Sequence, residues 1–431
     1  MWEEDWNSRE SLASCQAKEI NFVIKITEEV NVGKLRKFGK VLLSKSNIER
    51  MKNFDFNDIF YQEIYPKHLM EKIDQLLSVI PSREMYNPSN TIVLLDMSSE
   101  GKPRKVCRQG INKLAYALNI NPNQIIVINQ NVRYLQSIWR SISERHKNSL
   151  NWAFGDRFSL EICSQSQNIH HVTSIEDSAR KGSFCRHFIC LNNAVRPHRV
   201  AIYAYMRKSG LLSDSYFSFR SKNLAKGIQP NSSCSNIKRV GQKASVAYPS
   251  LKESIDELLV QDPNELDLTI DDTSTVTHAK ELIWNVPLHA MSKSLFSIVT
   301  ETTMSDGNRM LRFTEKTLKP LLFGRPFLVA GEPNLLPYLR ALGFKTFEGV
   351  IDETYDSIKN PAARLTSILE EISRLSNVPI NEPNSSTKFL QQICEHNQRH
   401  ILSGAFENQI LTLLRETLSA ALARARRSIP S

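Results

Sequence analysis

Two short runs of the sequence combine cations with helix-start signals in a way that suits a phosphorylated ligand. In the first, an apolar run ends at Asn192 and is followed by Arg196 and Arg199. Pro197 lies between the arginines, and proline suits the first turn of a helix because its missing N–H would have no partner there. The N–H groups and positive dipole end of such a helix, beside arginines that bind phosphate oxygens bidentately, would form an anion site. The alternative is a solvated basic helix start.

The second run, Arg312 to Gly331, places Thr314, Glu315 and Lys316 at the start of a predicted helix. Gly324 to Pro326 would end this helix before a short buried strand. At a helix N-terminus, the Glu315 carboxylate can accept hydrogen bonds from the hydroxyl groups of a sugar, and the adjacent Lys316 ammonium can contact a phosphate. Taken alone, the run fits a surface ion pair equally well.

Other chemistries lack support in the sequence. No GxGxxG, GxxxxGK[ST] or HExxH run occurs, and no Asp-x-Asp pair is present to hold a divalent metal against a diphosphate. Cys185, His187 and Cys190 form a C-x-H-x-x-C pattern, but they fall in a predicted buried strand whose side chains alternate between faces, and no partner pair lies nearby. We therefore predict no metal site.

The elements that would position these runs alternate between strands and helices. Apolar runs at 91–95 and 124–128 flank a helix around 111–118, which indicates a parallel βαβ unit. A second series begins with a strand at 184–191 and a helix at 197–209. Further strands are expected at 20–26, 296–300 and 326–329, further helices at 66–80, 314–323 and 334–342, a loop at 213–248, and a mostly helical chain after 361.

The chain has 431 residues, about three times the usual length of one domain, so two α/β domains with appendages are expected. We predict a mixed α/β region at 1–85 that could belong to the first domain, an N-terminal Rossmann-like domain at 86–182, a C-terminal Rossmann-like domain at 183–372 and a helical tail at 373–431.

The net charge of +10 is local: residues 181–250 carry twelve basic residues and one acid. This segment also contains Tyr205, Tyr216, Phe217 and Phe219, which could stack on bases, so a nucleic-acid-binding protein is an alternative. Neither a secretory signal nor an apolar run long enough to span a bilayer is evident, and the seven cysteines are thinly spread. A soluble protein of a reducing, cytoplasmic compartment, in a bacterium or a virus-infected cell, is the expectation.

Both runs resemble a known family. The segment from Arg312 to Gly331 resembles the donor-binding motif of α-1,3-fucosyltransferase-type glycosyltransferases, and the strand, Asn and Arg-x-x-Arg at 188–199 resemble the opening of their donor domain. A strand ending in Glu301 agrees in order and spacing. The chain is closer still to uncharacterised fucosyltransferase-like proteins of bacteria and large viruses, through runs similar to 190–199, 314–327, 338–347 and 352–356.

The resemblance covers about 184–370 and implies a GT-B glycosyltransferase, in which two Rossmann-like domains face a cleft. By matching position, Arg196, Arg199 and Lys316 would face the donor diphosphate, and Glu301 and Glu315 the hydroxyl groups. The full set of donor-binding candidates is Asn192, Arg196, Arg199, Glu301, Thr314, Glu315, Lys316 and Lys319. A nucleotide-diphosphate sugar would be the donor substrate, no cofactor is expected, and the acceptor could be a glycan, a lipid-linked molecule, a protein or a nucleic acid.

Glycosyl transfer also needs a base for the acceptor hydroxyl and neutralisation of the departing diphosphate. Because no Asp-x-Asp pair occurs, protein cations would neutralise the diphosphate, and we expect a metal-independent, inverting enzyme. The base is expected after a strand of the first domain, where Asp96 and Glu100 are candidates, although ordinary strand-end acids are the alternative. A transferase acting on modified DNA and a non-catalytic GT-B-like structural protein are further alternatives.

Overall fold

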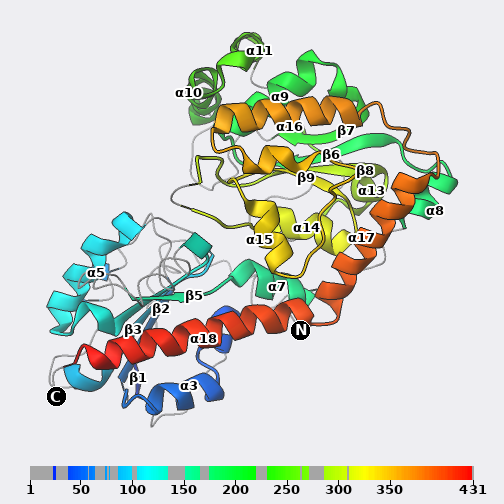
Figure 1. Ribbon diagram of the computed structural model, residues 1–431. Coiled ribbons are helices and arrows are strands. Elements are labelled where there is room, and N and C mark those ends of the chain that lie inside the picture. The colour runs from blue at the N-terminus through cyan, green and yellow to red at the C-terminus, as the bar shows by residue number, and fades with distance from the viewer. Residues whose placement is uncertain are drawn as a thin grey trace. The chain divides into compact units, whose positions relative to one another are not determined.

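The computed structural model describes residues 23–25, 37–56, 58–63, 73–74, 77, 86–99, 104–133, 151–165, 174–219, 231–262, 265–270, 286–307 and 310–429. The chain forms two compact units (Figure 1). Unit 1 comprises Met1–Glu161 together with Ile410–Ser431, and unit 2 comprises Ile162–Gln409. The division therefore precedes the predicted boundary near 182, and the end of the chain belongs to the first unit.

Unit 1 contains a five-stranded sheet in the order β1-β2-β3-β4-β5. Its strands are β1 (Val23–Lys25), β2 (Asp58–Glu63), β3 (Thr91–Met97), β4 (Ile125–Asn129) and β5 (Asn151–Phe154). The pair β1–β2 is antiparallel and the other pairs are parallel. The βαβ unit predicted at 91–128 is confirmed as β3, α5 (Arg104–Leu118) and β4.

One face of this sheet packs against α5. Leu95 and Val127 of the strands and Ile111 and Leu114 of the helix belong to one fully buried apolar cluster. The strands are apolar at nearly every position because both faces of a parallel sheet are covered. Unit 1 also contains α2 (Lys37–Leu42), α3 (Lys45–Lys52) and most of α7 (Arg157–Gln165).

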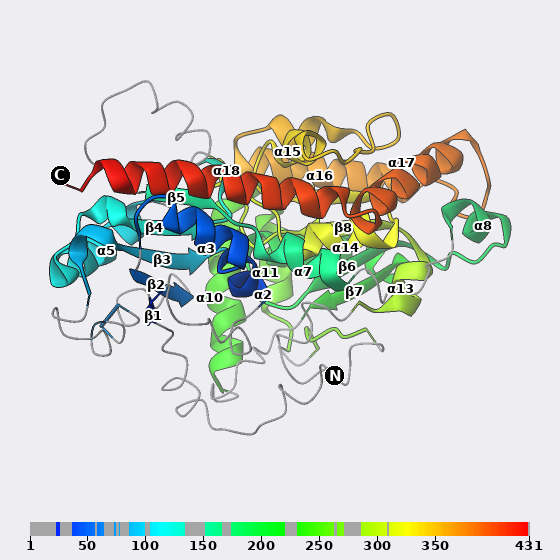
Figure 2. The same ribbon diagram turned by 90° about the horizontal axis from the view of Figure 1, so that it is seen from below.

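The edge strand β5 is covered by the C-terminal helix α18 (Ala405–Arg427), which is unbroken in Figure 2. Thr417 Oγ1 accepts a hydrogen bond from the backbone N–H of Phe154 at 2.9 Å, and the guanidinium of Arg424 donates to the carbonyl of Trp152 at 3.0 Å. These side chains take the place of a further strand, so the edge is not open for pairing with another chain.

Unit 2 contains four parallel strands in the order β7-β6-β8-β9. They are β6 (Arg186–Asn192), β7 (Ser215–Phe219), β8 (Ser294–Thr300) and β9 (Phe327–Ala330). Helices α9 (Pro197–Lys208) and α16 (Pro361–Leu375) lie on one side of the sheet and α14 (Glu315–Phe323) on the other (Figure 1). This is a doubly wound arrangement, and the strand order reverses between β6 and β8.

The prediction of a loop at 213–248 is wrong. The segment contains β7 and the helix α10 (Asn231–Ala247). The segment is rich in Ser, Asn, Gly and Lys, which are typical of loops, and this composition led to the prediction. Within α10, Gly241 lies against α11 (Lys252–Leu259): a Cβ atom there would stand 2.4 Å from a methyl carbon of Leu259, so a larger residue would displace that side chain.

The other expected elements of unit 2 are confirmed within a few residues, and the expected helix at 66–80 lies largely outside the described residues. The remaining helices are α8 (Ile175–Arg180), α13 (Leu288–Ser292), α15 (Leu335–Ala341) and α17 (Ser385–Leu402). The predicted α/β class is confirmed, with mainly parallel sheets in both units and a helical C-terminal region. No helix within the described part of the chain has the length and apolar character needed to cross a membrane.

Candidate functional site

A pocket of about 230 Å³ lies in unit 2 at the carboxyl ends of β6 and β8. This is the point of strand-order reversal, where open α/β sheets usually bind ligands because the flanking loops diverge. Its walls come from β6 and the loop after it (Ile189, Leu191–Ala194, Arg196), α9 (Arg199), β7 (Ser218), the chain before and within α13 (Pro287, Met291), β8 and its loop (Ser297–Thr300, Thr302), and α14 (Glu315, Lys316, Lys319, Pro320).

Helix α9 begins at this pocket without a side-chain cap. Its N-cap residue Arg196 has an extended backbone and an exposed side chain that lines the pocket. The next residue but one, His198, is buried, and its Nε2 lies 2.9 Å from the carbonyl oxygen of Glu301. Burial lowers the pKa of His198 to about 3, with a further effect from the charge of Arg199, so the imidazole is neutral at physiological pH.

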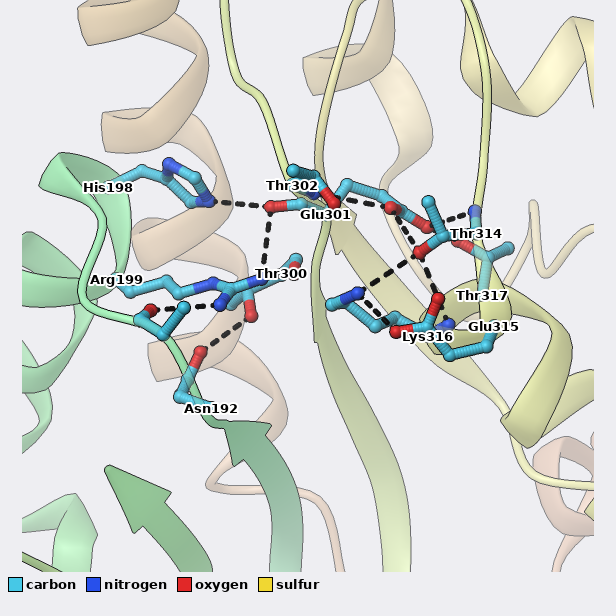
Figure 3. A network of polar contacts seen from close by, with 11 residues as sticks. Asn192, His198, Arg199, Thr300, Glu301, Thr302, Thr314, Glu315, Lys316 and Thr317 are labelled. Carbon is cyan, nitrogen blue, oxygen red and sulfur yellow. Dashed lines mark hydrogen bonds and ion pairs between the residues drawn. The ribbon is translucent and has the colours of Figure 1, made fainter. Parts of the chain in front are cut away.

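Arg199 joins the loops after β6 and β8 (Figure 3). Its guanidinium donates to the carbonyl oxygens of Ala194 at 2.9 Å and Thr300 at 2.8 Å. Burial lowers the pKa of Arg199 to about 10, which still leaves it charged at neutral pH. Its Nε is buried and has no hydrogen-bond partner among the described residues. Arg199 was predicted to bind the donor diphosphate, but two nitrogens of its guanidinium already donate to backbone carbonyl oxygens.

Glu301 is a buried carboxylate that organises the start of α14. Its oxygens accept hydrogen bonds from the backbone N–H of Thr314 at 2.9 Å, from Thr314 Oγ1 at 2.8 Å and from Thr317 Oγ1 at 2.7 Å (Figure 3). The backbone N–H of Thr302 donates to it at 3.3 Å. Glu301 was predicted to contact hydroxyl groups of the ligand, but it does not line the pocket, and its carboxylate is bonded to Thr314 and Thr317 instead.

Glu315 and Lys316 lie side by side at the mouth of the pocket. The Lys316 ammonium bonds to the Glu315 carboxylate and to Thr314 Oγ1, the latter at 3.2 Å (Figure 3). Burial alone would raise the pKa of Glu315, but the charges of Lys316 and Lys319 outweigh it and lower the pKa below the ordinary value. The glutamate is therefore ionised at neutral pH. Thr314 caps the helix and lies behind this pair.

Lys319 lies one turn further along α14 and also lines the pocket. Burial lowers the pKa of Lys319 to about 8, and the nearby carboxylate of Glu315 only partly opposes this effect. A lysine in this position changes charge just above physiological pH.

Asn192 ends β6 within the pocket wall. Its Oδ1 accepts a hydrogen bond from Thr300 Oγ1 at 2.6 Å, and its Nδ2 lies 3.1 Å from Cys190 Sγ. The bond from Thr300 ties β6 to β8 at the reversal point. Burial raises the pKa of Cys190 to about 12, so its thiol stays protonated.

The structure thus brings Asn192, Arg196, Arg199, Glu315, Lys316 and Lys319 to one pocket and places Glu301 and Thr314 directly behind it. Sequence reasoning missed the residues from β7 and α13, above all Ser218, Pro287 and Met291. They belong to no motif, and only the fold brings them to the pocket.

The two predicted base candidates lie in unit 1. Asp96 is buried at the end of β3, where it accepts hydrogen bonds from the Tyr61 hydroxyl at 2.5 Å and from the backbone N–H of Ser98 at 2.9 Å. Both of its carboxylate oxygens are therefore bonded within the protein. Glu100 lies outside the described residues.

The run at 352–356 supports the fold. The Asp356 carboxylate accepts hydrogen bonds from the backbone N–H groups of Leu335 and Leu336 and so caps α15. Tyr355 accepts a hydrogen bond from the backbone N–H of Val329 in β9. This run lies away from the pocket lining.

The cysteine and histidine pattern at 185–190 holds no metal-ligand cluster, and none is found elsewhere among the described residues. His187 pairs with Asp214 and with the carbonyl of Val378 instead.

The basic residues at 181–250 are spread over several elements. Arg196 and Arg199 are at the pocket, whereas Lys208 at the far end of α9 pairs with Glu253 and Glu257. Lys238 lies on α10, and Arg220, Lys222 and Lys226 lie outside the described residues. The described cations of this segment therefore belong to several different elements.

Comparison with known proteins gives little further guidance. No protein-family model matches the chain, and no curated protein matches it. Among solved structures, a UDP-forming α,α-trehalose-phosphate synthase from Burkholderia xenovorans is similar at 11% sequence identity and a TM-score of 0.36, over 84% of this chain and 74% of that one. A likeness of this size assigns neither a family nor a ligand.

Proposed function

We propose that the pocket of unit 2 binds the diphosphate of a nucleotide sugar and that the protein is a glycosyltransferase. The observation that carries the proposal is the convergence of two helix N-termini, those of α9 and α14, on one pocket lined by Arg196 and Lys316. Helix N-termini favour anions through their N–H groups and dipoles, and cations strengthen the effect. The uncapped start of α9 beside Arg196 suits one phosphate, and the ammonium groups of Lys316 and Lys319 suit the other, because the N–H groups of Lys316 and Thr317 in α14 are already bonded to Thr314.

We further propose the GT-B type of this reaction, with donor chemistry similar to that of fucosyltransferases. Two α/β units and the motif at 312–331 support this assignment. The acceptor oxygen would form a bond to the anomeric carbon as the bond from that carbon to the diphosphate breaks, which inverts the configuration. The acceptor proton would pass to a base in unit 1, for which Asp96 and Glu100 stay the candidates, and Arg196, Lys316 and Lys319 would neutralise the diphosphate without a divalent metal.

The donor class is tested by a thermal-shift screen of the full chain with GDP-, UDP-, CMP- and dTDP-sugars, in EDTA and then with Mg²⁺ or Mn²⁺. We expect one base family to raise the melting temperature in EDTA, because ligands that bind only the folded state stabilise it. Stabilisation only with metal would contradict metal independence. No response at all, with salt-sensitive binding of DNA or RNA, would favour the nucleic-acid alternative.

The site itself is tested by Lys316→Ala. Loss of a charged hydrogen bond costs about 1.5–3 kcal/mol, so the affinity for the stabilising nucleoside diphosphate should fall about tenfold or more in calorimetry. Lys388→Ala is the matched control, because Lys388 is an exposed lysine of α17 outside the pocket lining. Equal affinities of both variants and the wild type would place the diphosphate elsewhere.

A further inference from the structure

Three side chains at the carboxyl edge of the unit 1 sheet have a buried polar atom without a hydrogen-bond partner among the described residues. The atoms are Ser98 Oγ directly after β3, Asn129 Nδ2 at the last residue of β4, and Arg133 Nε four residues further on. Ser98 and Asn129 are almost fully buried, whereas Arg133 is only partly buried. Buried polar atoms without a partner are rare because burial removes their bonds to water. This edge therefore has unused hydrogen-bonding capacity.

The strand register and two turns place the three side chains at one end of β3 and β4. Asn129 lies opposite Met97 in the parallel register, so Ser98 is the next residue beyond this pair. Asn129 Oδ1 accepts a hydrogen bond from the backbone N–H of Asn131 at 2.8 Å, and Asn131 Oδ1 accepts one from that of Arg133 at 3.2 Å. These successive turns hold the chain from 129 to 133 close to the end of β4.

Helix α5 covers the same face of the sheet. Met97 belongs to one apolar cluster with Ile111 and Leu114 of α5, and Asn129 pairs with Met97, so the Asn129 side chain lies on the face that α5 covers. Because α5 connects two parallel strands, it begins at their carboxyl edge. Its first turn contains no acidic residue, although the helix dipole favours negative charge there. A bound anion would supply that charge.

The acids buried at this edge, Asp96 and Asp156, are already bonded to other groups. Asp96 points to the face opposite α5, because successive strand residues alternate, and there it accepts a hydrogen bond from the Tyr61 hydroxyl. Asp156 accepts hydrogen bonds from Gln130 Nε2 at 2.9 Å and from Ser159 Oγ at 2.6 Å. The three atoms without partners can all donate, and one of them belongs to a cation, so the complementary ligand is an oxyanion.

We propose that Ser98, Asn129 and Arg133 form a phosphate-binding site in unit 1, next to the start of α5. A phosphate group presents three acceptor oxygens, one for each donor, whereas a carboxylate has only two oxygens. The guanidinium suits phosphate, and the start of a helix favours its negative charge. Because Arg133 is only partly buried, a ligand can reach the site from its side. The proposal does not depend on the function proposed for the unit 2 pocket.

The test follows the Nε–H signal of Arg133 by nuclear magnetic resonance in the full chain with ¹⁵N-labelled arginine. Arg133→Gln assigns this signal by its loss, and Arg133→Lys serves the same purpose if that variant does not fold. Inorganic phosphate should shift the signal in a saturable manner. Ser98→Ala should weaken the affinity at least about threefold without lowering the free energy of unfolding, because Ser98 Oγ has no bond within the described protein to lose.

Ser99→Ala is the matched control, because it removes the hydroxyl group of the adjacent serine, which is not one of the three donors. It should bind phosphate like the wild type. An Arg133 signal that does not respond to phosphate would overturn the site, and so would equal phosphate affinities of Ser98→Ala and Ser99→Ala. A response to acetate without a response to phosphate would overturn the choice of ligand. Nucleoside diphosphate binding in unit 2 is tested separately by Lys316→Ala, so the two proposals can fail independently.

Discussion

We expect Lys319 to make ligand binding in the pocket depend on pH. Its ammonium lines the wall one turn from Glu315, and burial lowers the pKa of Lys319 to about 8. Phosphate oxygens favour the charged form, so the affinity for a nucleoside diphosphate should fall up to about tenfold between pH about 7 and about 9. The ligand itself changes little in this window because phosphate pKa values lie near 6. Calorimetry at several pH values measures the effect.

Two variants isolate this lysine. Lys319→Gln should bind weakly and without pH dependence in that window, and Lys319→Arg should bind well across it because arginine stays charged. The effect on stability has the opposite sign. The pKa of Lys319 in the folded chain lies below its unfolded value of about 10.4, so between pH about 8 and about 10 the unfolded chain binds more protons than the folded chain. The free energy of unfolding should therefore increase as pH rises through this window. A pH-independent affinity of the wild type would contradict the assignment.

The sequence was informative for residues at helix starts. Arg196 lies where α9 begins shortly after β6, and Lys316 lies in the first turn of α14, which follows β8 after a longer loop. In both cases the helix-start residues themselves indicated the position. The bonding of Arg199 and Glu301 could not be predicted, because their partners are backbone carbonyls and threonines fixed by the packing of two loops. Met291 carries no motif at all.

At the scale of the element, Glu301 fixes the first turn of α14 against the end of β8. Glu301→Gln turns one acceptor oxygen into an N–H donor that would face the Thr314 N–H or a threonine hydroxyl. We expect a loss of about 1–3 kcal/mol in the free energy of unfolding, faster hydrogen exchange at the Thr314 amide and weaker nucleoside diphosphate binding.

Thr317→Val is the graded control, because it removes only one of the hydrogen bonds to Glu301 and leaves the Thr314 amide bonded. Exchange at that amide should then change less than in Glu301→Gln. If Glu301→Gln lost ligand affinity with no change in exchange, Glu301 would touch the ligand directly, as the family resemblance implies, instead of acting through α14.

Elements were predictable where the hydrophobic period was strong and uninterrupted. The strands predicted at 91–95 and 296–300 from apolar runs are β3 and β8, each two residues longer in the structure. Helix α10 was missed because its first half is rich in Ser and Asn, yet Ile237, Val240 and Ala244 are buried at helical spacing. At Gly241 a Cβ atom would stand 2.4 Å from a methyl carbon of Leu259, so the glycine favours close packing of α10 against α11.

At the scale of the whole molecule, the chain returns to its first unit through α18. Leu414, Leu418, Leu422 and Ala425 recur every three or four residues along this helix and are fully or almost fully buried. Together with the bonds from Thr417 and Arg424 to β5, they make residues 410–431 part of the core of unit 1. A helical C-terminal segment was predictable from its sequence, but this long-range pairing was not.

Removal of residues 410–431 should therefore affect the two units differently. Unit 1 would lose a core face and the cover of its edge strand, so hydrogen exchange in β3–β5 should rise to that of unfolded chain, whereas β6–β9 should stay protected. Every residue that lines the pocket lies within unit 2, so nucleoside diphosphate affinity should change less than about threefold.

Thr417→Val is the control for this truncation, because it removes only the hydrogen bond from the Phe154 amide. Hydrogen exchange should then become faster at that amide alone. If truncation abolished nucleotide binding while β6–β9 stayed protected, the donor site would require unit 1, and the pocket would not be sufficient to bind the nucleotide.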